Sequence, residues 1–117
     1  MKRLFSATLN SLRGVRWGAG HEPAVREEMI ALAFALPVGF FIAPNAAWYV
    51  AMIGALLLVL AVEFLNTAIE KFADYITKQQ HREIGMVKDL GSAAVLCTLC
   101  LAGIVWFAAL AVRFGLI

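Results

Sequence analysis

Two long stretches of this chain contain no charged side chain, and they limit what the chain can fold into. No Asp, Glu, Lys or Arg occurs in residues 29–62 or in residues 90–112, which are 34 and 23 residues long. A helix needs roughly 20 apolar residues to cross a bilayer. Pro44-Asn45, a dipeptide typical of turns, interrupts the longer stretch near its middle. The pattern therefore predicts three membrane spans, near residues 28–43, 46–64 and 93–112.

The composition excludes several classes of protein. Of the 117 residues, 62% are hydrophobic and 15% are charged, whereas soluble domains average about 45–50% apolar and about 25% charged residues. A small soluble domain must cover a large surface with polar groups. An ordinary soluble monomer, a disordered chain and a secreted disulfide scaffold are therefore excluded. The net charge of +2 gives little general attraction to nucleic acid, so we expect no nucleic-acid partner.

The basic residues predict the orientation of a single domain, residues 1–117, in the membrane. Short cytoplasmic loops of membrane proteins carry most of the Lys and Arg. Five of the ten basic residues lie in residues 1–28 and four in residues 65–91, and the last is Arg113. We therefore expect both segments, with the N-terminus, in the cytoplasm and the C-terminus outside.

Residues 1–18 are expected to form an amphipathic helix on the membrane surface. Its apolar arc would face the lipid boundary and its basic arc the anionic headgroups. We expect Gly18-Ala19-Gly20 to end this helix and Pro23 to begin the next, because the first turn of a helix does not need the missing N–H of proline. The segment lacks the apolar core of a cleaved signal peptide. The later helices are expected over about 23–43, 46–74 and 90–114.

The residues most suggestive of chemistry follow the second span. Glu63, Asn66 and Glu70 are three and four residues apart, so they share one helix face, which Asp74 extends. This face is expected to meet other helices or a wet cleft, because a carboxylate exposed to lipid is costly. A desolvated glutamate can act as a general base, paired carboxylates can bind Mg²⁺, and a transporter can use such a glutamate to bind a proton or a cationic drug. A hydrogen-bond network that only packs helices is the structural alternative.

A second polar cluster, residues 85–92, leads into the third span. Lys88 is a compact cation that can meet a phosphate. Asp89 or Ser92 can cap the third-span helix, and Gly85 and Gly91 permit a tight loop and a close helix approach. The cluster contains neither the Walker motif nor the dinucleotide-binding glycine motif.

Together, the two clusters resemble motifs of the prokaryotic integral-membrane diacylglycerol kinase family. The string Glu63 to Glu70, followed after 17 residues by the string Lys88 to Val95, carries a resemblance that covers nearly the whole chain. It implies an all-α fold: three transmembrane helices and a surface helix, assembled as a homotrimer with active sites shared between subunits. It also implies transfer of the γ-phosphoryl group of ATP to diacylglycerol, giving phosphatidic acid, with Mg²⁺, at the cytosolic face of the bacterial inner membrane.

The resemblance also implies roles for individual residues. Glu63 matches the general base, and Glu22 and Glu70 match the carboxylates that hold the metal. The residues that match ATP-binding positions are Arg3, Asn10, Glu22, Glu70, His81, Lys88 and Asp89. Those that match positions near the lipid substrate are Arg3, Glu28, Glu63, Asn66 and Ser92. Thr77 to Gln80 depart from the family's pattern, which leaves the adenine contacts open.

Three other functions remain as alternatives. Related enzymes phosphorylate undecaprenol, and the sequence separates the two lipid alcohols poorly. A small multidrug transporter is also a short chain with one membrane glutamate, but it typically has four spans and carries that glutamate in the first. A structural membrane subunit would need neither the Glu63 and Glu70 pair nor Lys88-Asp89.

Overall fold

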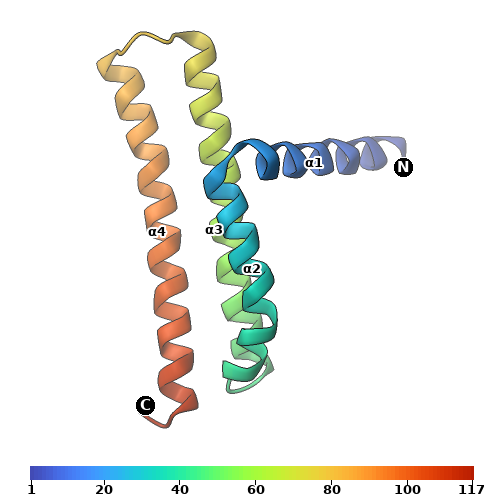
Figure 1. Ribbon diagram of the computed structural model, residues 1–117, viewed down its shortest axis with the longest axis vertical. Coiled ribbons are helices and arrows are strands. Elements are labelled where there is room, and N and C mark those ends of the chain that lie inside the picture. Colours follow the sequence, from blue (N-terminus) through green and yellow to red (C-terminus); the bar gives the residue numbers. More distant parts are fainter.

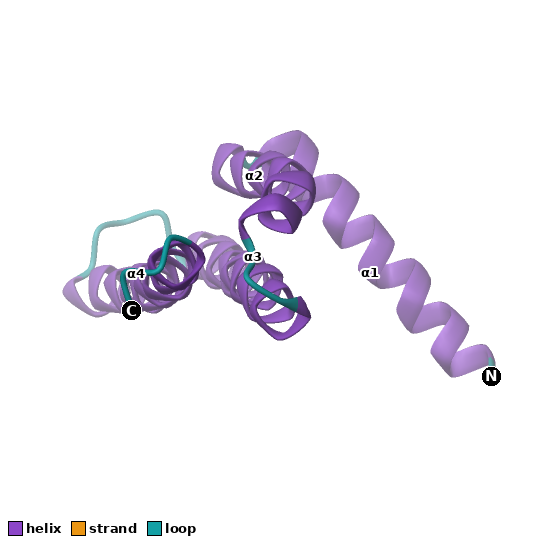
Figure 2. Cartoon of the chain, turned by 90° about the horizontal axis from the view of Figure 1, so that it is seen from below, coloured by secondary structure: helices purple, strands orange, loops and turns teal.

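The protein consists of four α-helices and no strand in a computed structural model that describes residues 1–117. The helices are α1 (Lys2–His21), α2 (Pro23–Ile42), α3 (Ala46–Ile76) and α4 (Arg82–Arg113). Helices α2, α3 and α4 run alongside one another, and α1 turns away from them at its junction with α2 and projects outward (Figure 1). The view from below shows the same arrangement, with the start of α1 far from α4 (Figure 2). The predicted all-α fold is confirmed.

Two of these helices, α3 and α4, are long and apolar enough to cross a membrane. Only 22% and 11% of their most apolar segments are buried within the chain, so they differ from the core helices of a soluble protein. In α2, charged side chains occupy residues 26–28, and the uncharged remainder is shorter than the roughly 20 residues of a typical span. Exposed apolar faces of this kind are typical of helices that span a membrane.

The junctions on either side of α2 follow the sequence closely. Pro23 occupies the first turn of α2, directly after Glu22 at the N-cap, as predicted. The predicted turn at Pro44-Asn45 joins α2 to α3. There the Asn45 side chain accepts a hydrogen bond from the backbone N–H of Trp48 at 3.0 Å and so caps α3.

The predicted end of the first helix is wrong. Helix α1 continues through Gly18 and Gly20 to His21. Gly18 is buried, and a Cβ atom at that position would lie 2.9 Å from the Phe64 ring and 3.3 Å from Val25. The glycine therefore serves close packing, and this contact outweighs its low helix propensity.

The predicted start of the last helix is also wrong. Helix α4 begins at Arg82, with His81 as its N-cap, rather than near residue 90. Asp89 and Ser92 therefore do not cap it, and Gly85 lies inside the helix rather than in a loop. The prediction placed the helix start near the point where the polar sequence becomes apolar. Polar side chains do not interrupt the backbone hydrogen bonds of a helix, so α4 begins earlier, within the polar segment.

Helix α3 contacts both α2 and α4 and is the centre of the fold. Small side chains, Ala55 and Ala102, lie with Val59 in the buried seam between α3 and α4, and such residues let membrane helices approach closely. The Trp106 indole N–H donates to the Met52 carbonyl oxygen across this seam at 3.1 Å. Because α3 is one continuous helix, the seam also determines which face of its polar half is buried.

Candidate active site

The polar half of α3 combines buried and exposed groups on one face. Glu63 and Asn66 are each 7% exposed, and they lie on a helix that continues without a break from its apolar half. The Asn66 side-chain N–H donates to Glu70 Oε1 at 2.8 Å, and the Glu70 side chain reaches the surface. Within two turns, α3 therefore presents a buried carboxylate, a buried amide and an exposed carboxylate.

Acidic residues from the start of α2 lie beside this face. The charge of Glu63 interacts with those of Glu70 and Glu22, and that of Glu28 interacts with Glu63. We call these four residues the acidic cluster. None of the four pairs with a basic side chain, since the one salt bridge in the chain joins Lys88 to Asp74. The cluster gathers acidic side chains without an internal basic partner, which suits the binding of a cation.

Two oxygen atoms in this region are buried without a hydrogen-bond partner. They are Glu28 Oε2 and Asn66 Oδ1, whereas most buried polar atoms in proteins are paired. Asn66 Oδ1 faces Gly91 of α4, where a Cβ atom would collide with it. Gly91 thus allows α4 to lie directly against the amide, as the predicted close helix approach requires.

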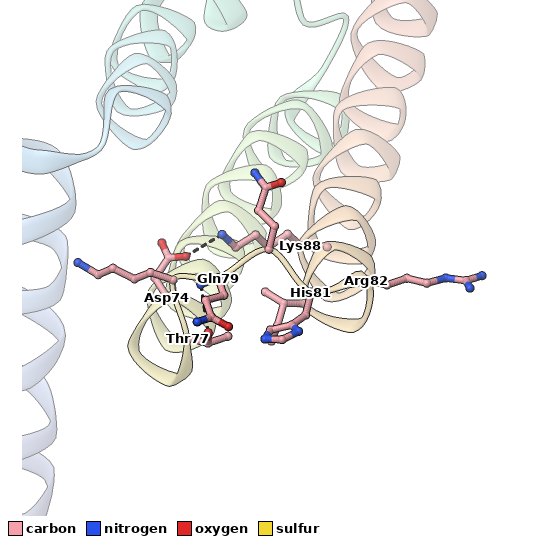
Figure 3. A pocket seen from close by; sticks show the side chains of 10 residues that line it. Asp74, Thr77, Gln79, His81, Arg82 and Lys88 are labelled. Atoms are coloured by element: carbon pink, nitrogen blue, oxygen red, sulfur yellow. Dashed lines mark hydrogen bonds and ion pairs between the residues drawn. The ribbon is translucent and has the colours of Figure 1, made fainter.

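A second polar region lies where residues 77–81 join α3 to α4. It is a hollow of about 510 Å³ whose lining is almost entirely polar (Figure 3). Lys88 Nζ donates to Asp74 Oδ1 at 2.7 Å across the hollow. This hydrogen bond holds the pKa of Asp74 below its ordinary value of 3.8. Lys78, His81 and Arg82 also line the hollow, so it offers several cationic or protonatable groups to an anion.

The remaining predicted site residues lie outside both regions. Arg3 and Asn10 are exposed on the part of α1 that projects from the other helices (Figure 1), and Asn10 accepts a hydrogen bond from Arg13. Asp89 and Ser92 are exposed on α4 and line a separate hollow with apolar neighbours. A single chain therefore brings together Glu63 with four other predicted residues and places two more at the hollow.

Comparison of the sequence with known proteins identifies the family of this chain. The sequence model described as prokaryotic diacylglycerol kinase matches residues 9–110. The chain belongs to this family. It is 37% identical over 106 residues to the diacylglycerol kinase of Haemophilus influenzae, covering 91% of this chain and 90% of the relative. It is 36% identical over 113 residues to that of Escherichia coli K12, covering 97% and 93%. The diacylglycerol kinase of Helicobacter pylori is 30% identical over 105 residues, covering 90% and 82%.

The structure of this family member adds contacts that the sequence pattern did not predict. The pairing of Asp74 with Lys88 crosses the connection between α3 and α4, and opposite charges on either side of that connection were the one signal for it. Lys71 lies over the Trp17 ring at 4.3 Å from its centroid, a contact between α1 and α3. The lone Trp17 on the polar arc of the first helix was the hint that this helix meets another part of the protein.

Proposed function

We propose that this membrane protein is an ATP-dependent lipid kinase that phosphorylates the hydroxyl group of diacylglycerol and yields phosphatidic acid. The family match over residues 9–110 supports the reaction class, and the relatives named diacylglycerol kinase support this lipid substrate. The observation that carries the mechanism is the burial of Glu63 beside the hydrogen-bonded Asn66 and Glu70 on one face of α3.

In this proposal Glu63 is the general base. It accepts the proton of the lipid hydroxyl as the hydroxyl oxygen bonds to the γ-phosphorus of ATP, the bond to the β-phosphate oxygen breaks, and ADP leaves. General-base assistance contributes about 10²- to 10⁴-fold to such reactions. Burial of Glu63 to 7% exposure keeps bulk water from competing with the lipid hydroxyl.

Glu22 and Glu70 would hold Mg²⁺, which neutralises charge on the phosphates when it is bound. Mg²⁺ is usually held by one or two carboxylates together with substrate phosphates and water. No three Asp, Glu, His or Cys side chains in this chain are grouped to hold a metal ion, so the nucleotide phosphates would have to complete its coordination. The Asn66 amide orients Glu70 through its 2.8 Å hydrogen bond. The uncompensated charge of the acidic cluster is the observation that fits a divalent cation.

Lys88 and His81 would bind the nucleotide from the hollow between α3 and α4. An ammonium group meets phosphate as a point charge, and Lys88 is already aimed into the hollow by Asp74. The hollow adjoins the end of α3 that carries Glu70. Phosphates near Lys88 could therefore extend toward the metal-binding carboxylates.

The active enzyme is proposed to be a homotrimer with composite sites. Arg3 and Asn10 on α1, and Asp89 and Ser92 on α4, are exposed and belong neither to the acidic cluster nor to the hollow at residues 77–81. In the trimer they would complete the nucleotide and lipid subsites of a neighbouring subunit. Crosslinking that yields only monomers in lipid would contradict this arrangement.

The topology completes the proposal for the single domain 1–117. Helix α2 would be the third span, lying against α3 and crossing with it. The N-terminus and the 77–81 connection would lie in the cytoplasm of a bacterial inner membrane, and the C-terminus outside. Both polar regions would then open to the side where ATP is available.

Phosphoryl transfer from labelled Mg-ATP tests this function directly. The purified protein would be reconstituted into vesicles that contain either diacylglycerol or undecaprenol. We expect label in phosphatidic acid and its loss when EDTA removes Mg²⁺. Label in undecaprenyl phosphate alone would reassign the lipid substrate, and label in neither lipid would overturn the kinase proposal.

A further inference from the structure

Three side chains stack on one another where α1 meets α3: Lys71, Trp17 and His21, here called the junction stack. The Lys71 Nζ atom lies 4.3 Å from the centroid of the Trp17 ring. The Trp17 and His21 rings are 4.4 Å apart between centroids and nearly parallel, at 7°. His21 Nδ1 lies 2.8 Å from the Trp17 carbonyl oxygen, which fixes the imidazole. A cation over a tryptophan face is attracted by the ring quadrupole, so the stack ties the last turn of α1 to α3.

The end of α1 also contacts α2, where the Arg26 guanidinium donates to the Ala19 carbonyl oxygen at 3.3 Å. Most of this helix is exposed and stands apart from α3 and α4 (Figures 1 and 2). Gly18, next to Trp17, is the buried residue of α1, and it packs against the Phe64 ring. The glycine allows α1 to approach α3 closely, and the junction stack adds a second contact between the two helices.

The residue at each end of the junction stack is the sequence neighbour of a glutamate of the proposed metal site. Lys71 directly follows Glu70 on α3, and His21 directly precedes Glu22. Glu22 has an extended backbone between α1 and α2, with φ −116° and ψ 110°. Because Glu22 belongs to neither helix, its placement depends on how the two helices are held against α3.

We propose that Trp17 and Lys71 are positioning residues, whose contact sets the separation between Glu22 and Glu70 and thereby the affinity for Mg-ATP. The inference rests on the proposed kinase function. The Lys71 ammonium acts through the indole that it covers rather than through the nucleotide. Its role thus differs from that of Lys88, which lines the hollow.

The test is a double-mutant cycle of Trp17→Leu and Lys71→Met in the reconstituted full-length protein. Each single change should raise the KM for Mg-ATP by about five-fold, with a much smaller change in kcat, because cation–π contacts of this kind have modest strength. The double variant should match the single variants, since both changes remove the same contact. Lys71→Arg should restore the KM, because a guanidinium group also stacks on an indole. Arg113→Met, which removes a charge at the far end of α4, is the matched control and should leave the KM unchanged.

Two outcomes of the cycle would overturn the inference. Effects that multiply in the double variant would show that the two residues act separately. A raised KM for Lys71→Met together with an unchanged KM for Trp17→Leu would assign Lys71 to direct contact with the nucleotide.

Fluorescence provides a readout that does not depend on activity. In a chain with Trp48→Phe and Trp106→Phe, Trp17 is the remaining tryptophan, and Lys71→Met should shift its emission while Arg113→Met should not. An unchanged emission would show that the junction stack does not form, which also overturns the inference. Failure of the kinase proposal is recognised separately, because the unaltered protein would then phosphorylate no lipid.

Discussion

The two halves of α3 bury the same face of one helix but carry different chemistry. In the half that follows the N-cap, Met52, Ala55 and Val59 form an apolar seam with α4. In the other half, Glu63 and Asn66 continue that seam at the same helical spacing. Buried polar groups without full hydrogen bonding lower stability, and Asn66 Oδ1 is such a group.

The comparison separates residues that stabilise the fold from residues whose presence does not stabilise it. The apolar seam gives close packing, which drives association of membrane helices. The polar half places Glu63 and Glu70 beside Glu22 and Glu28 of the α2 region without a basic partner, which packing alone would not favour. Such a departure from the stable arrangement is typical of functional sites.

The sharpest test of this contrast replaces a polar side chain by an apolar one in the polar half and shortens an apolar side chain in the other half. Asn66→Leu should lower kcat by about 10- to 100-fold, because Glu70 loses the amide that orients it. Its resistance to unfolding should equal or exceed that of the unaltered protein, since an unpaired buried oxygen is removed. Turnover and thermal unfolding in the same lipid would measure both.

The matched control lies two turns earlier on the same face. Val59→Ala should lower the free energy of unfolding by about 2 kcal/mol and leave turnover per folded molecule unchanged. If Asn66→Leu instead lost activity only in proportion to lost folded protein, the polar half would be a packing network.

A smaller effect is expected where α4 meets the polar half. Gly91→Ala places a methyl group against Asn66 Oδ1, so it should displace the amide and lower kcat by about tenfold. Gly103→Ala, on the same helix with no neighbour within 4 Å of the added carbon, is the control. Equal activity of the two variants would show that the contact between Gly91 and Asn66 has no bearing on the site.

The smallest effect concerns the pairing of Asp74 with Lys88. Because this hydrogen bond lowers the pKa of Asp74 in the folded protein, it stabilises the fold above the ordinary pKa of 3.8, and the contribution is lost as pH falls through the lower folded-state pKa. Unfolding followed from about pH 6 to about pH 3 should therefore depend slightly less on pH in Asp74→Asn than in the unaltered protein. A steeper dependence in the variant would contradict the pairing.

Much of this fold could be predicted from charge and spacing. The charge-free stretches located the apolar helices, Pro23 and Pro44-Asn45 located two junctions, and the three- and four-residue spacing placed Glu63, Asn66 and Glu70 on one face. These features are local, because they depend on helical period and on the backbone limits of proline.

The errors and omissions came from contacts between distant segments. The glycines at the end of α1 did not break the helix because Phe64, far along the chain, fills the space beside Gly18. The pairing of Lys88 with Asp74 and the stacking of Lys71 on Trp17 depend on how helices face one another, which no local pattern specifies. The roles proposed for Arg3, Asn10, Asp89 and Ser92 would depend further on neighbouring subunits of the proposed trimer.

The most direct test of the account is to measure nucleotide binding and phosphoryl transfer together in Glu63→Gln. The amide keeps the size of the side chain but cannot accept the proton of the lipid hydroxyl. We predict that the variant binds labelled Mg-ATP with a Kd close to that of the unaltered protein, while formation of phosphatidic acid falls by about 10²- to 10⁴-fold. Phosphatidic acid formed at an undiminished rate by a folded, nucleotide-bound Glu63→Gln variant would contradict the central claim.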